Sequence, residues 1–396
     1  MKILSVDDAK KFADGKVVVI ITGVTGQDGS FMADYLLKNT DYEIFGGARR
    51  LSVSNHENIS HLNGEPRFHL INFDLTDAHS ISQIISQLQP TYFINFAAQS
   101  FVKSSWDFPA QTWETNTTSM IHILESIRLH APNCRFYNAG SSEEFGGVEY
   151  TPQDEKHPMR PRSPYGASKA AARQLVKVYR ESYGLYAIQG WLFNHEGTRR
   201  GEEFVTRKIT KGVAKIAKDL KNGKTAIPLE LGNLDARRDW TDAEDCVQAV
   251  WRMLNQEKYN KVLNEEHHDA WYELYNEQEN KRQMTEWESK RIKEYVVSSG
   301  ENHTVREFVE QAFEVAGIQG QWYMTDNDPQ SERFILWNSD GTTDGKSIVI
   351  VNPSFYRPAE IEQLLGNHTN ITEDLEWKPT TTFRGLVKKM VEEDLT

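Results

Sequence analysis

The stretch Lys16-Val-Val-Val-Ile-Ile-Thr22, followed at once by Gly23-Val-Thr-Gly26-Gln-Asp-Gly29, decides the fold of this chain. A short run of β-branched apolar residues is typical of a parallel strand that is buried on both faces. The three glycines permit a tight turn, and Phe31, Leu36 and Leu37 then predict a helix. Strand, glycine loop and helix in this order indicate a site where a dinucleotide pyrophosphate rests on a helix N-terminus. A glycine turn of purely structural use is the alternative.

Further apolar runs alternate with helical patterns along the chain. These predicted strands are Glu43 to Ala48, Phe68 to Phe73, Tyr92 to Ala97, Arg135 to Ala139 and Ala187 to Phe193. The alternation predicts an α/β fold, a doubly wound parallel sheet of the Rossmann type. Ligands of such sheets lie beyond the carboxyl ends of the strands. The segments Ser141-Ser-Glu143 and Asn194-His-Glu196 fall at such ends.

The residues after the second strand indicate which dinucleotide binds. An NAD site usually carries an acidic residue there, whereas arginine accommodates the 2′-phosphate of NADP. Arg49 and Arg50 occupy this place and favour NADP, with a solvated basic turn as the alternative. By order along the chain, Asp74 and Leu75 are expected beside the adenine, and Ala97-Ala-Gln-Ser100 beside the nicotinamide ribose.

The segment Tyr165-Gly-Ala-Ser-Lys169 supplies the best candidate for a catalytic base. Of the 15 tyrosines, only Tyr165 has a lysine four positions later, and this helical spacing places both side chains on one face. A phenol has a pKa of about 10 and acts as a base near neutral pH only if a nearby cation favours the phenolate. We therefore expect Lys169 to lower the pKa of Tyr165. An ordinary exposed helix pair is the alternative.

Length and composition exclude several classes of protein. The chain has 396 residues, 38% of them hydrophobic, and no apolar run approaches the roughly 20 residues that span a bilayer. Its start, Met1-Lys-Ile-Leu4, has no signal-peptide core, so a cytoplasmic protein without membrane contact is expected. The net charge of −12 argues against nucleic-acid binding. Two cysteines give no disulfide framework and no metal spacing. The adjacent His267 and His268 would point apart on a helix, so no metal is expected.

The chain divides into four parts. Residues 1–16 are predicted as an N-terminal extension, and residues 17–197, with parts of 236–255 and 294–303, as an NADP-binding Rossmann domain. A smaller, discontinuous substrate-binding lobe is expected from 198–235 and 304–396. Residues 256–293 read as a charged, helical insertion, because Glu, Lys, Asn, Gln, Trp and Tyr dominate there without Gly or Pro.

The motifs together resemble the extended short-chain dehydrogenases/reductases and, within them, the GDP-mannose 4,6-dehydratase family. The resemblance covers most of the chain. It is carried by Ile21-Thr-Gly-Val-Thr-Gly-Gln-Asp-Gly-Ser30, Asp74-Leu-Thr-Asp77, Pro161-Arg-Ser-Pro-Tyr-Gly-Ala-Ser-Lys169, Phe193-Asn-His-Glu196, Arg199-Arg-Gly201, Phe204-Val-Thr-Arg-Lys-Ile209, Leu231-Gly-Asn-Leu-Asp-Ala236, Arg238-Asp-Trp240 and Tyr356-Arg-Pro-Ala-Glu-Ile361. The glycines and the Tyr/Lys pair mark the superfamily, while Asn-His-Glu and Gly-Asn-Leu-Asp resemble the dehydratases in particular.

The resemblance implies a role for each matching position. The implied catalytic residues are Ser141, where the family has Thr, with Glu143, Tyr165 and Lys169. The implied cofactor-binding residues are Gly23, Thr25, Gly26, Gln27, Asp28, Gly29, Arg49, Arg50, Asp74, Leu75, Ala97, Ala98, Ser100, Tyr165, Lys169, Asn194, His195, Glu196 and Arg200. The implied substrate-binding residues are Ser100, Glu143, Asn194, Lys208, Arg238, Arg357 and Glu360. The guanidinium group of an arginine can donate paired hydrogen bonds to diphosphate oxygens, and a carboxylate can accept hydrogen bonds from the two hydroxyls of a ribose.

The implied reaction converts GDP-mannose, or a close GDP-hexose, to the GDP-4-keto-6-deoxy sugar by transient oxidation with bound NADP. Two alternatives remain: a GDP-ketosugar reductase or epimerase, which would also need Tyr165 and Lys169, and a non-catalytic NADP sensor. The segment Arg49-Arg-Leu-Ser-Val-Ser54 resembles one that reaches a neighbouring subunit in the family. A homodimer or homotetramer is expected on that analogy.

Overall fold

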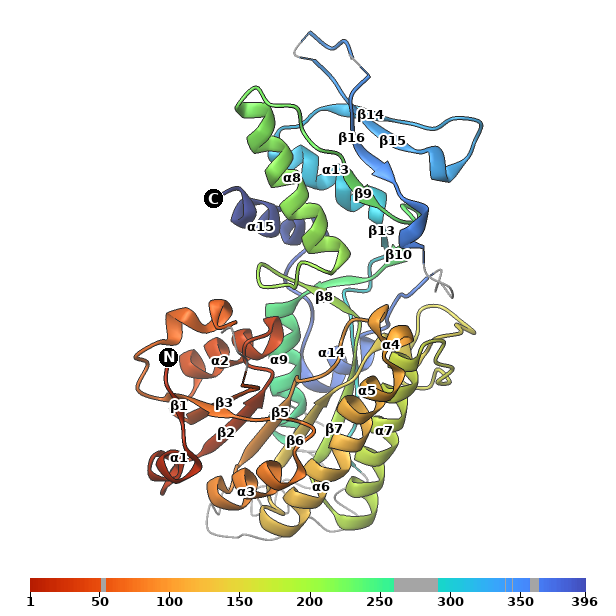
Figure 1. Ribbon diagram of the computed structural model, residues 1–396. Helices are drawn as coiled ribbons and strands as arrows, with labels where there is room; N and C mark the ends of the chain where they lie inside the picture. Colours follow the sequence, from red (N-terminus) through yellow and green to blue (C-terminus); the bar gives the residue numbers. More distant parts are fainter. Residues whose placement is uncertain (51–54, 260–290, 339, 344, 357–362) are drawn as a thin grey trace.

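The computed structural model describes residues 1–50, 55–259, 291–338, 340–343, 345–356 and 363–396. A parallel sheet forms the larger part, and a smaller lobe sits beyond the carboxyl ends of its strands (Figure 1). The strand order is β1-β4-β3-β2-β5-β6-β7-β12, and every pairing is parallel. The predicted doubly wound sheet is confirmed. Its strands are β1 (Ile3–Leu4), β2 (Val18–Thr22), β3 (Glu43–Ala48), β4 (Phe68–Asn72), β5 (Tyr92–Asn95), β6 (Arg135–Ala139), β7 (Ala187–Leu192) and β12 (Val296–Val297).

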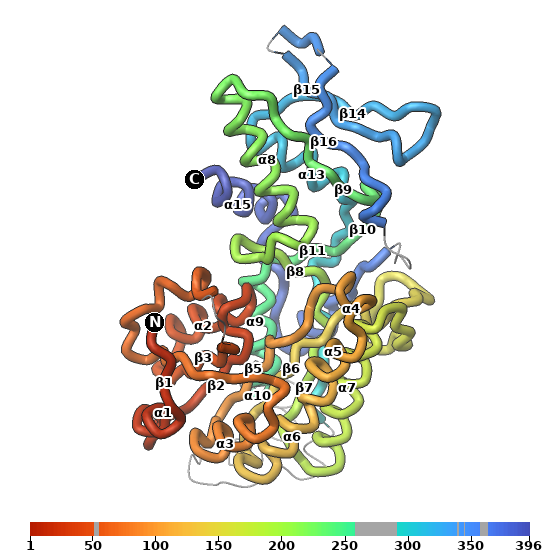
Figure 2. Tube along the Cα trace, in the orientation of Figure 1, coloured from red at the N-terminus to blue at the C-terminus, as the bar shows by residue number. Residues whose placement is uncertain are grey.

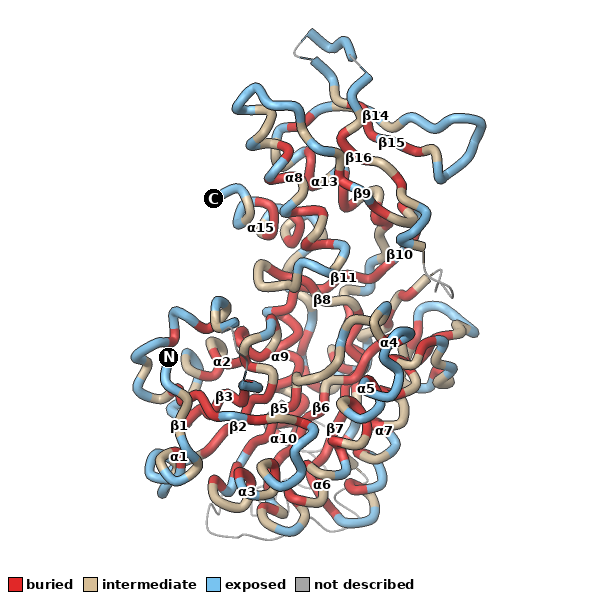
Figure 3. The backbone as a smooth tube through the Cα atoms, in the orientation of Figure 1, coloured by how far each residue is buried: buried red, intermediate tan, exposed pale blue. Residues whose placement is uncertain are grey.

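Two layers of helices cover the sheet. One face packs against α2 (Gln27–Asn39), α9 (Ala243–Met253) and α14 (Thr369–Leu375), and the other against α1 (Val6–Ala13), α3 (Ala78–Leu88), α6 (Ser119–His130) and α7 (Pro164–Tyr183). The strands are buried on both faces because their side chains alternate between these two cores (Figure 3). Short helical segments complete this part: η1 (Glu57–Leu62), α4 (Ser104–Asp107), α5 (Pro109–Trp113), η2 (Glu114–Thr118), η3 (Ser142–Glu144) and α10 (Gln256–Tyr259).

The lobe has a core of its own. A four-stranded sheet, β14-β15-β16-β9, packs against α8, α13 and α15. The elements are α8 (Val205–Lys221), β9 (Leu229–Leu231), α13 (Val305–Ala316), β14 (Gly320–Tyr323), η4 (Pro329–Ser331), β15 (Arg333–Leu336), β16 (Ser347–Val351), η5 (Pro353–Phe355) and α15 (Phe383–Leu395). Two small ladders lie where the chain crosses between the parts: β8 (Asn194–Glu196) with β11 (Trp240–Asp242), and β10 (Arg237–Arg238) with β13 (His303–Thr304).

Two segments lie elsewhere than the sequence-based division places them. The extension of residues 1–16 belongs to the large sheet, because β1 pairs with β4 and Ala9 of α1 is buried in the core of the α3 face. Residues 369–375, assigned from sequence to the lobe, form α14, and its Ile371 and Leu375 are buried in the core of the large sheet. The chain therefore leaves the lobe, covers the sheet and returns to the lobe as α15 (Figure 2).

Candidate active site

The loop between β2 and α2 fits a pyrophosphate. Gly23 has φ +68°, a left-handed conformation that favours glycine, and a Cβ on Gly29 would come within 2.4 Å of the Gly23 carbonyl oxygen. Helix α2 begins after Gly26, which provides no side-chain cap, so its first N–H groups face the loop. Gly26 is exposed and Thr25 half-buried, whereas Gln27 and Gly29 are buried. The first N–H groups of a helix have no partner within the helix, so the N-terminus of α2 can bind an anion.

Asp28 and the segment Asn194-His195-Glu196 meet beside this loop. His195 Nε2 lies 2.8 Å from Asp28 Oδ2, and its Nδ1 lies 2.8 Å from the Phe193 carbonyl oxygen. Burial lowers the pKa of His195, but the charge of Asp28 and their hydrogen bond together raise it above its ordinary value. Arg200 forms an ion pair with Glu196 at 3.1 Å. The structure thus brings together four residues that were predicted to bind the cofactor: Asp28, His195, Glu196 and Arg200.

The remaining predicted cofactor residues follow the carboxyl ends of β3, β4 and β5. Arg49 and Arg50 are exposed directly after β3. After β4, Asp74 Oδ1 accepts hydrogen bonds from the backbone and side chain of Thr76, and Leu75 is buried in the core. After β5 come Ala97 and Ala98, both half-buried, and the exposed Ser100. This edge is the switch point of the sheet, where β2 and β5 separate the two directions of strand order.

Helix α7 carries the predicted Tyr/Lys pair. Ser163 caps the helix through a 3.0 Å bond from the Gly166 N–H, Pro164 occupies its first turn, and Gly184 ends it at φ +65°. Tyr165 and Lys169 are both buried, and Lys169 Nζ lies 6.0 Å from the centroid of the Tyr165 ring. Lys169 Nζ also donates a 2.7 Å hydrogen bond to the Ala139 carbonyl oxygen at the end of β6.

Ser141 and Glu143 lie at the start of η3, directly after β6. The Ser141 hydroxyl accepts a 3.2 Å hydrogen bond from the Glu143 N–H, and Ser141 also hydrogen-bonds to Tyr165. Ser141 is buried, whereas Glu143 keeps intermediate exposure. The structure therefore brings together all four predicted catalytic residues, one pair from the end of β6 and one from the first turns of α7.

Burial dominates the electrostatics of this cluster. It raises the pKa of Tyr165 above its ordinary value; the bond to Ser141 opposes this shift, and the negative charges of Glu143 and Glu144 add to it. Burial likewise lowers the pKa of Lys169 to about 8, which Glu144 and Asp28 partly offset. The sequence-based expectation that Lys169 brings the pKa of Tyr165 below its usual value is therefore wrong for the protein alone, because spacing along a helix says nothing about desolvation.

The predicted substrate residues lie where the lobe faces the sheet. Asn194 begins β8, Arg238 is buried in β10, and Lys208 lies in the first turn of α8. Lys208 Nζ stands 4.0 Å from the centroid of the exposed Phe355 ring, and Lys103 Nζ, from beyond β5, stands 5.8 Å from the same ring. Lys103 therefore faces the same aromatic ring from the opposite part of the molecule.

Arg357 and Glu360 lie outside the described residues, as do residues 51–54 and most of the 256–293 insertion.

Two residues of the site were missed by reasoning from sequence. Lys103 follows Ser100 by three positions and directly precedes α4, and its closeness to Ser100 was its only local signal. Glu144 follows Glu143 directly, yet it is fully buried and bonds to the Ser141 N–H. Its partner Arg173 comes four residues after Lys169 on α7, a spacing that places it on the same helix face.

Among the described ranges, no group of three or more His, Cys, Asp or Glu side chains is arranged to hold a metal ion. No helix in the same ranges is both long and apolar enough to cross a bilayer.

The GDP-mannose 4,6 dehydratase family model matches residues 20–291 and 278–390. Curated relatives match along nearly the whole chain. The GDP-mannose 4,6 dehydratase of Drosophila melanogaster is 39% identical over 96% of this chain and 86% of its own length. The human enzyme of that name is 36% identical over 96% and 91%.

This chain belongs to the GDP-mannose 4,6-dehydratase family.

Solved structures of other proteins share the fold of this family member. dTDP-glucose 4,6-dehydratase from Bacillus anthracis, in complex with NAD, superposes with a TM-score of 0.67 at 18% identity, covering 95% of this chain and 96% of the other. RMD from Pseudomonas aeruginosa, complexed with NADPH, gives 0.65 at 20% identity, covering 96% and 99%. At these identities the likeness shows the fold alone.

Proposed function

We infer that the protein is a lyase that removes water from GDP-mannose and yields the GDP-4-keto-6-deoxy sugar. The observation that carries this inference is the approach of Tyr165 and Lys169 to Ser141 and Glu143 in a member of this family. The family relationship identifies GDP-mannose as the substrate. The four side chains provide the proton transfers that the reaction needs.

The glycine loop and the N-terminus of α2 would hold a nicotinamide cofactor, which would supply reversible hydride transfer with no net change in its own oxidation state.

Tyr165 is the base for the C4 hydroxyl. Its phenol lies against the Ser141 hydroxyl, so both groups can hydrogen-bond to the same substrate oxygen. Because burial raises the pKa of Tyr165, the proton leaves the phenol only where positive charge is close. The buried ammonium of Lys169 is held toward the ring by the Ala139 carbonyl and provides such a charge.

Glu143 is the base for C5. Once C4 is a ketone, the proton on C5 becomes acidic, and its removal expels the C6 hydroxyl as water. Glu143 keeps intermediate exposure and lies two residues from Ser141, so its carboxylate is available for the same substrate. Protonated Glu143 then gives its proton to the departing hydroxide, which leaves as water. When hydride is added at C6, C5 must take up a proton, and Tyr165, which received the proton of the C4 hydroxyl, supplies it, so that the proton transfers balance over one turnover.

NADP is the proposed form of the cofactor. Arg49 and Arg50 are exposed directly after β3, where the adenosine ribose of a dinucleotide lies in folds of this type. A guanidinium offers paired donors to the oxygens of a 2′-phosphate.

The lobe binds the GDP moiety. Lys208 and Lys103 face Phe355 from opposite parts of the molecule, and burial and the charge of Lys103 both lower the pKa of Lys208, against the opposing charge of Glu230. A diphosphate between the two ammonium groups would relieve their repulsion. Asn194 and Ser100 are proposed to contact the hexose, Arg238 and Arg357 the diphosphate, and Glu360 the guanosine ribose.

A product analysis tests the proposed reaction. Purified protein is incubated with GDP-mannose and a catalytic amount of NADP, and the product is examined by mass spectrometry and NMR. The expected product has lost one water and carries a C4 ketone and a C6 methyl group, with no net change in reduced cofactor. Stoichiometric consumption of NADPH on a GDP-ketosugar, without loss of water from GDP-mannose, would instead establish the reductase alternative.

The homodimer or homotetramer and the cytoplasmic location expected from the sequence stay predictions. Light scattering of the purified protein and cell fractionation test them.

A further inference from the structure

Two consecutive carboxylates, Glu143 and Glu144, have opposite environments. Glu143 keeps intermediate exposure, whereas Glu144 has none. Glu144 Oε1 accepts hydrogen bonds from the Ser141 N–H at 2.8 Å and from Gln189 Nε2 at 3.0 Å, and its Oε2 accepts one from Arg173 Nε at 2.5 Å. Three donors hold the fully buried Glu144 carboxylate, so it is fixed in place.

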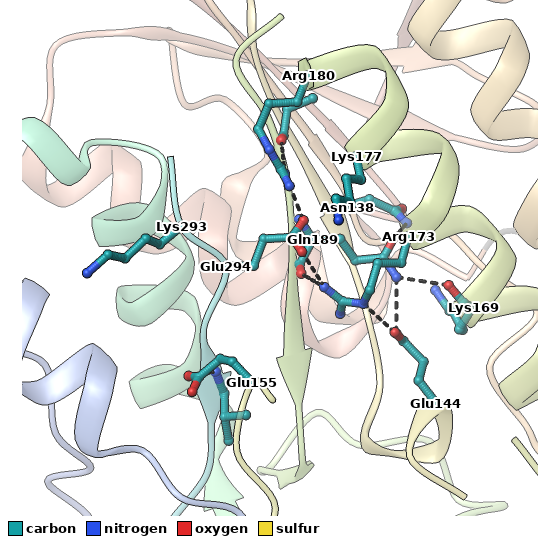
Figure 4. Close-up of polar contacts among 12 residues, drawn as sticks. Asn138, Glu144, Glu155, Lys169, Arg173, Lys177, Arg180, Gln189, Lys293 and Glu294 are labelled. Atoms are coloured by element: carbon teal, nitrogen blue, oxygen red, sulfur yellow. Dashed lines mark hydrogen bonds and ion pairs between the residues drawn. The ribbon is translucent and has the colours of Figure 1, made fainter. Parts of the chain in front are cut away.

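Arg173 stands at the centre of this buried cluster (Figure 4). Its Nη1 donates to Glu294 Oε2 at 2.8 Å, and its guanidinium stacks over the Trp191 ring at 3.5 Å from the centroid. Glu294 is also paired with Arg180 at 2.9 Å. Two carboxylates and two guanidinium groups therefore balance one another below the site, as buried charges require.

The cluster joins the two halves of the catalytic group. Tyr165, Lys169 and Arg173 follow one another at intervals of four on α7 and share one face of the helix. Glu144 meanwhile holds the backbone of Ser141 at the end of β6. Gln189 connects both, because its Nε2 donates to the Lys169 carbonyl oxygen at 3.0 Å as well as to Glu144.

The backbone leaves room for this contact at a single glycine. A Cβ on Gly140 would lie 2.2 Å from the Gly190 carbonyl oxygen and 2.8 Å from both Arg173 Nη2 and Glu144 Oε1. The pair thus lies directly against the main chain that carries Ser141.

We propose that Glu144 and Arg173 are positioning residues of the dehydration, whose buried pair holds the Ser141–Glu143 segment against the face of α7 that carries Tyr165 and Lys169. This inference rests on the proposed function. It assigns different roles to the adjacent carboxylates: Glu143 is the base for C5, and Glu144 orients the backbone from which Glu143 and Ser141 extend. Small displacements of reacting groups reduce turnover strongly, by up to about 100-fold for 1 Å.

Two double variants separate positioning from charge balance. In Glu144→Gln with Arg173→Met, the pair loses both charges, but the amide oxygen still accepts the Ser141 N–H. In Glu144→Leu with Arg173→Met, both charges are lost and so is that acceptor. The ion pair between Glu294 and Arg180 is retained in both variants. The two proteins have the same net charge and differ in the side-chain amide at position 144, whose oxygen can accept from the Ser141 N–H and from Gln189 Nε2.

The measurements are kcat, KM for GDP-mannose and the ratio of dehydrated product to reduced cofactor. We expect the Gln/Met variant to stay within about 10-fold of the wild-type kcat, and the Leu/Met variant to lose a further 10-fold or more at an unchanged KM. In the Leu/Met variant, reduced cofactor should accumulate without product, because Glu143 is displaced from C5. Equal kcat values and equal product ratios for the two doubles would overturn the positioning role.

Arg173→Lys is a single substitution, so it tests the proposal even if the two double variants fail to fold. Lysine keeps the positive charge but cannot replace the fork that reaches both Glu144 and Glu294. We expect kcat to fall about 10-fold at an unchanged KM; a wild-type kcat would contradict the proposal.

Lys177→Met is the control: it removes a half-exposed cation from the same helix and should leave kcat unchanged.

The failure of the proposed function and that of the positioning role can be distinguished. If the wild-type protein forms no dehydrated product, the proposed function fails. If the wild-type protein forms this product and the two double variants have equal kcat values and product ratios, only the positioning role fails.

Discussion

At the scale of single residues, Glu143 separates elimination from simple oxidation. Hydride transfer at C4 needs Tyr165, Lys169 and the cofactor, whereas loss of water also needs a base at C5. Glu143→Gln keeps the size of the side chain and removes that base. We expect the formation of dehydrated product to fall by about 10²- to 10⁴-fold, while reduced cofactor still appears in single-turnover absorbance.

Glu125→Gln, at a surface position of α6, serves as the control for this variant and should retain wild-type turnover. Product release by Glu143→Gln at the wild-type rate would remove Glu143 from the mechanism.

Arg49 tests the choice of cofactor. If its guanidinium binds the 2′-phosphate, Arg49→Ala should weaken NADP binding about 10-fold and leave NAD binding nearly unchanged. Calorimetric titration of both nucleotides measures this difference. Arg128→Ala, on α6, changes the net charge equally and should alter neither affinity. Equal affinity of the wild-type protein for NAD and NADP would contradict the assignment.

The His195–Asp28 pair predicts a pH dependence of stability. The folded pKa of His195 is raised above about 6.5, so the pair stabilises the protein fully below that pH and loses this effect as pH rises through the folded value. Burial raises the pKa of Asp28, but the charge of His195 and their hydrogen bond lower it by more, so the pKa lies below its ordinary value. The stabilisation by the pair is therefore also lost when Asp28 becomes protonated in acid. His195→Gln should cost about 2 kcal/mol at pH 6 and flatten the slope above pH 6.5.

Urea unfolding of the cofactor-free protein between pH 5.5 and 9 measures this slope. His61→Gln is the matched control, because the 2.7 Å pair of His61 with Asp34 is substantially exposed and should contribute little. If the free energies of unfolding of the wild-type protein and of His195→Gln changed with pH in parallel, the predicted contribution of the His195–Asp28 pair would be excluded.

At the scale of elements, the ends of the insertion are joined to each other. Gln256 Nε2 donates to the Lys293 carbonyl oxygen at 2.7 Å, and the Lys293 N–H donates to Gln256 Oε1 at 3.1 Å. Arg135, at the start of β6, forms a buried 2.9 Å ion pair with Glu257. These anchors lie at the amino ends of the strands, on the edge of the sheet opposite to the site.

Replacing residues 260–290 with a short Gly/Ser link should therefore leave kcat within about threefold, because strand length separates the anchors from the carboxyl edge. A longer deletion, 257–291, also removes the buried carboxylate that pairs with Arg135 and should destabilise the protein by about 3 kcal/mol. Turnover and thermal unfolding of both variants measure the two effects. Loss of turnover in the shorter deletion, with cofactor still bound, would place the insertion in the site.

At the scale of the whole molecule, Asp239 ties together segments that cross between the sheet and the lobe. Its buried carboxylate accepts hydrogen bonds from the Ser299 N–H at 2.7 Å, the Gly300 N–H at 3.0 Å and the Gly366 N–H at 3.1 Å. In Asp239→Asn, the amide NH₂ would face a backbone N–H. We expect a loss of about 2 kcal/mol in stability and a raised KM for GDP-mannose, because Arg238 is adjacent.

Cofactor affinity of Asp239→Asn should stay unchanged, since the glycine loop is not involved. Asp235→Asn, at an exposed position paired with Arg306, is the control and should behave as the wild-type protein in both assays. An unchanged KM would show that Asp239 does not set the placement of the substrate.

The sequence by itself determined the features that depend on neighbouring residues. The six predicted strands lie within two residues of the observed ones, because a β-branched run buried between two helix layers has a local pattern. The glycine loop and the Tyr165/Lys169 pair were visible for the same reason, as each depends on spacing within one turn or one helix. The family followed from these motifs and is confirmed by the matches along the chain.

Only the tertiary structure decided what depends on residues far apart in the chain. It placed β1 at the edge of the large sheet and α14 against one face of that sheet. It also brought Lys103 and Lys208 to the same Phe355 ring. It also joined Glu144, Arg173 and Glu294 in one buried cluster, although they lie in three different segments. Burial, which raises the pKa of Tyr165 and lowers that of Lys169, arises from the whole packed molecule, and no local spacing in the sequence encodes it.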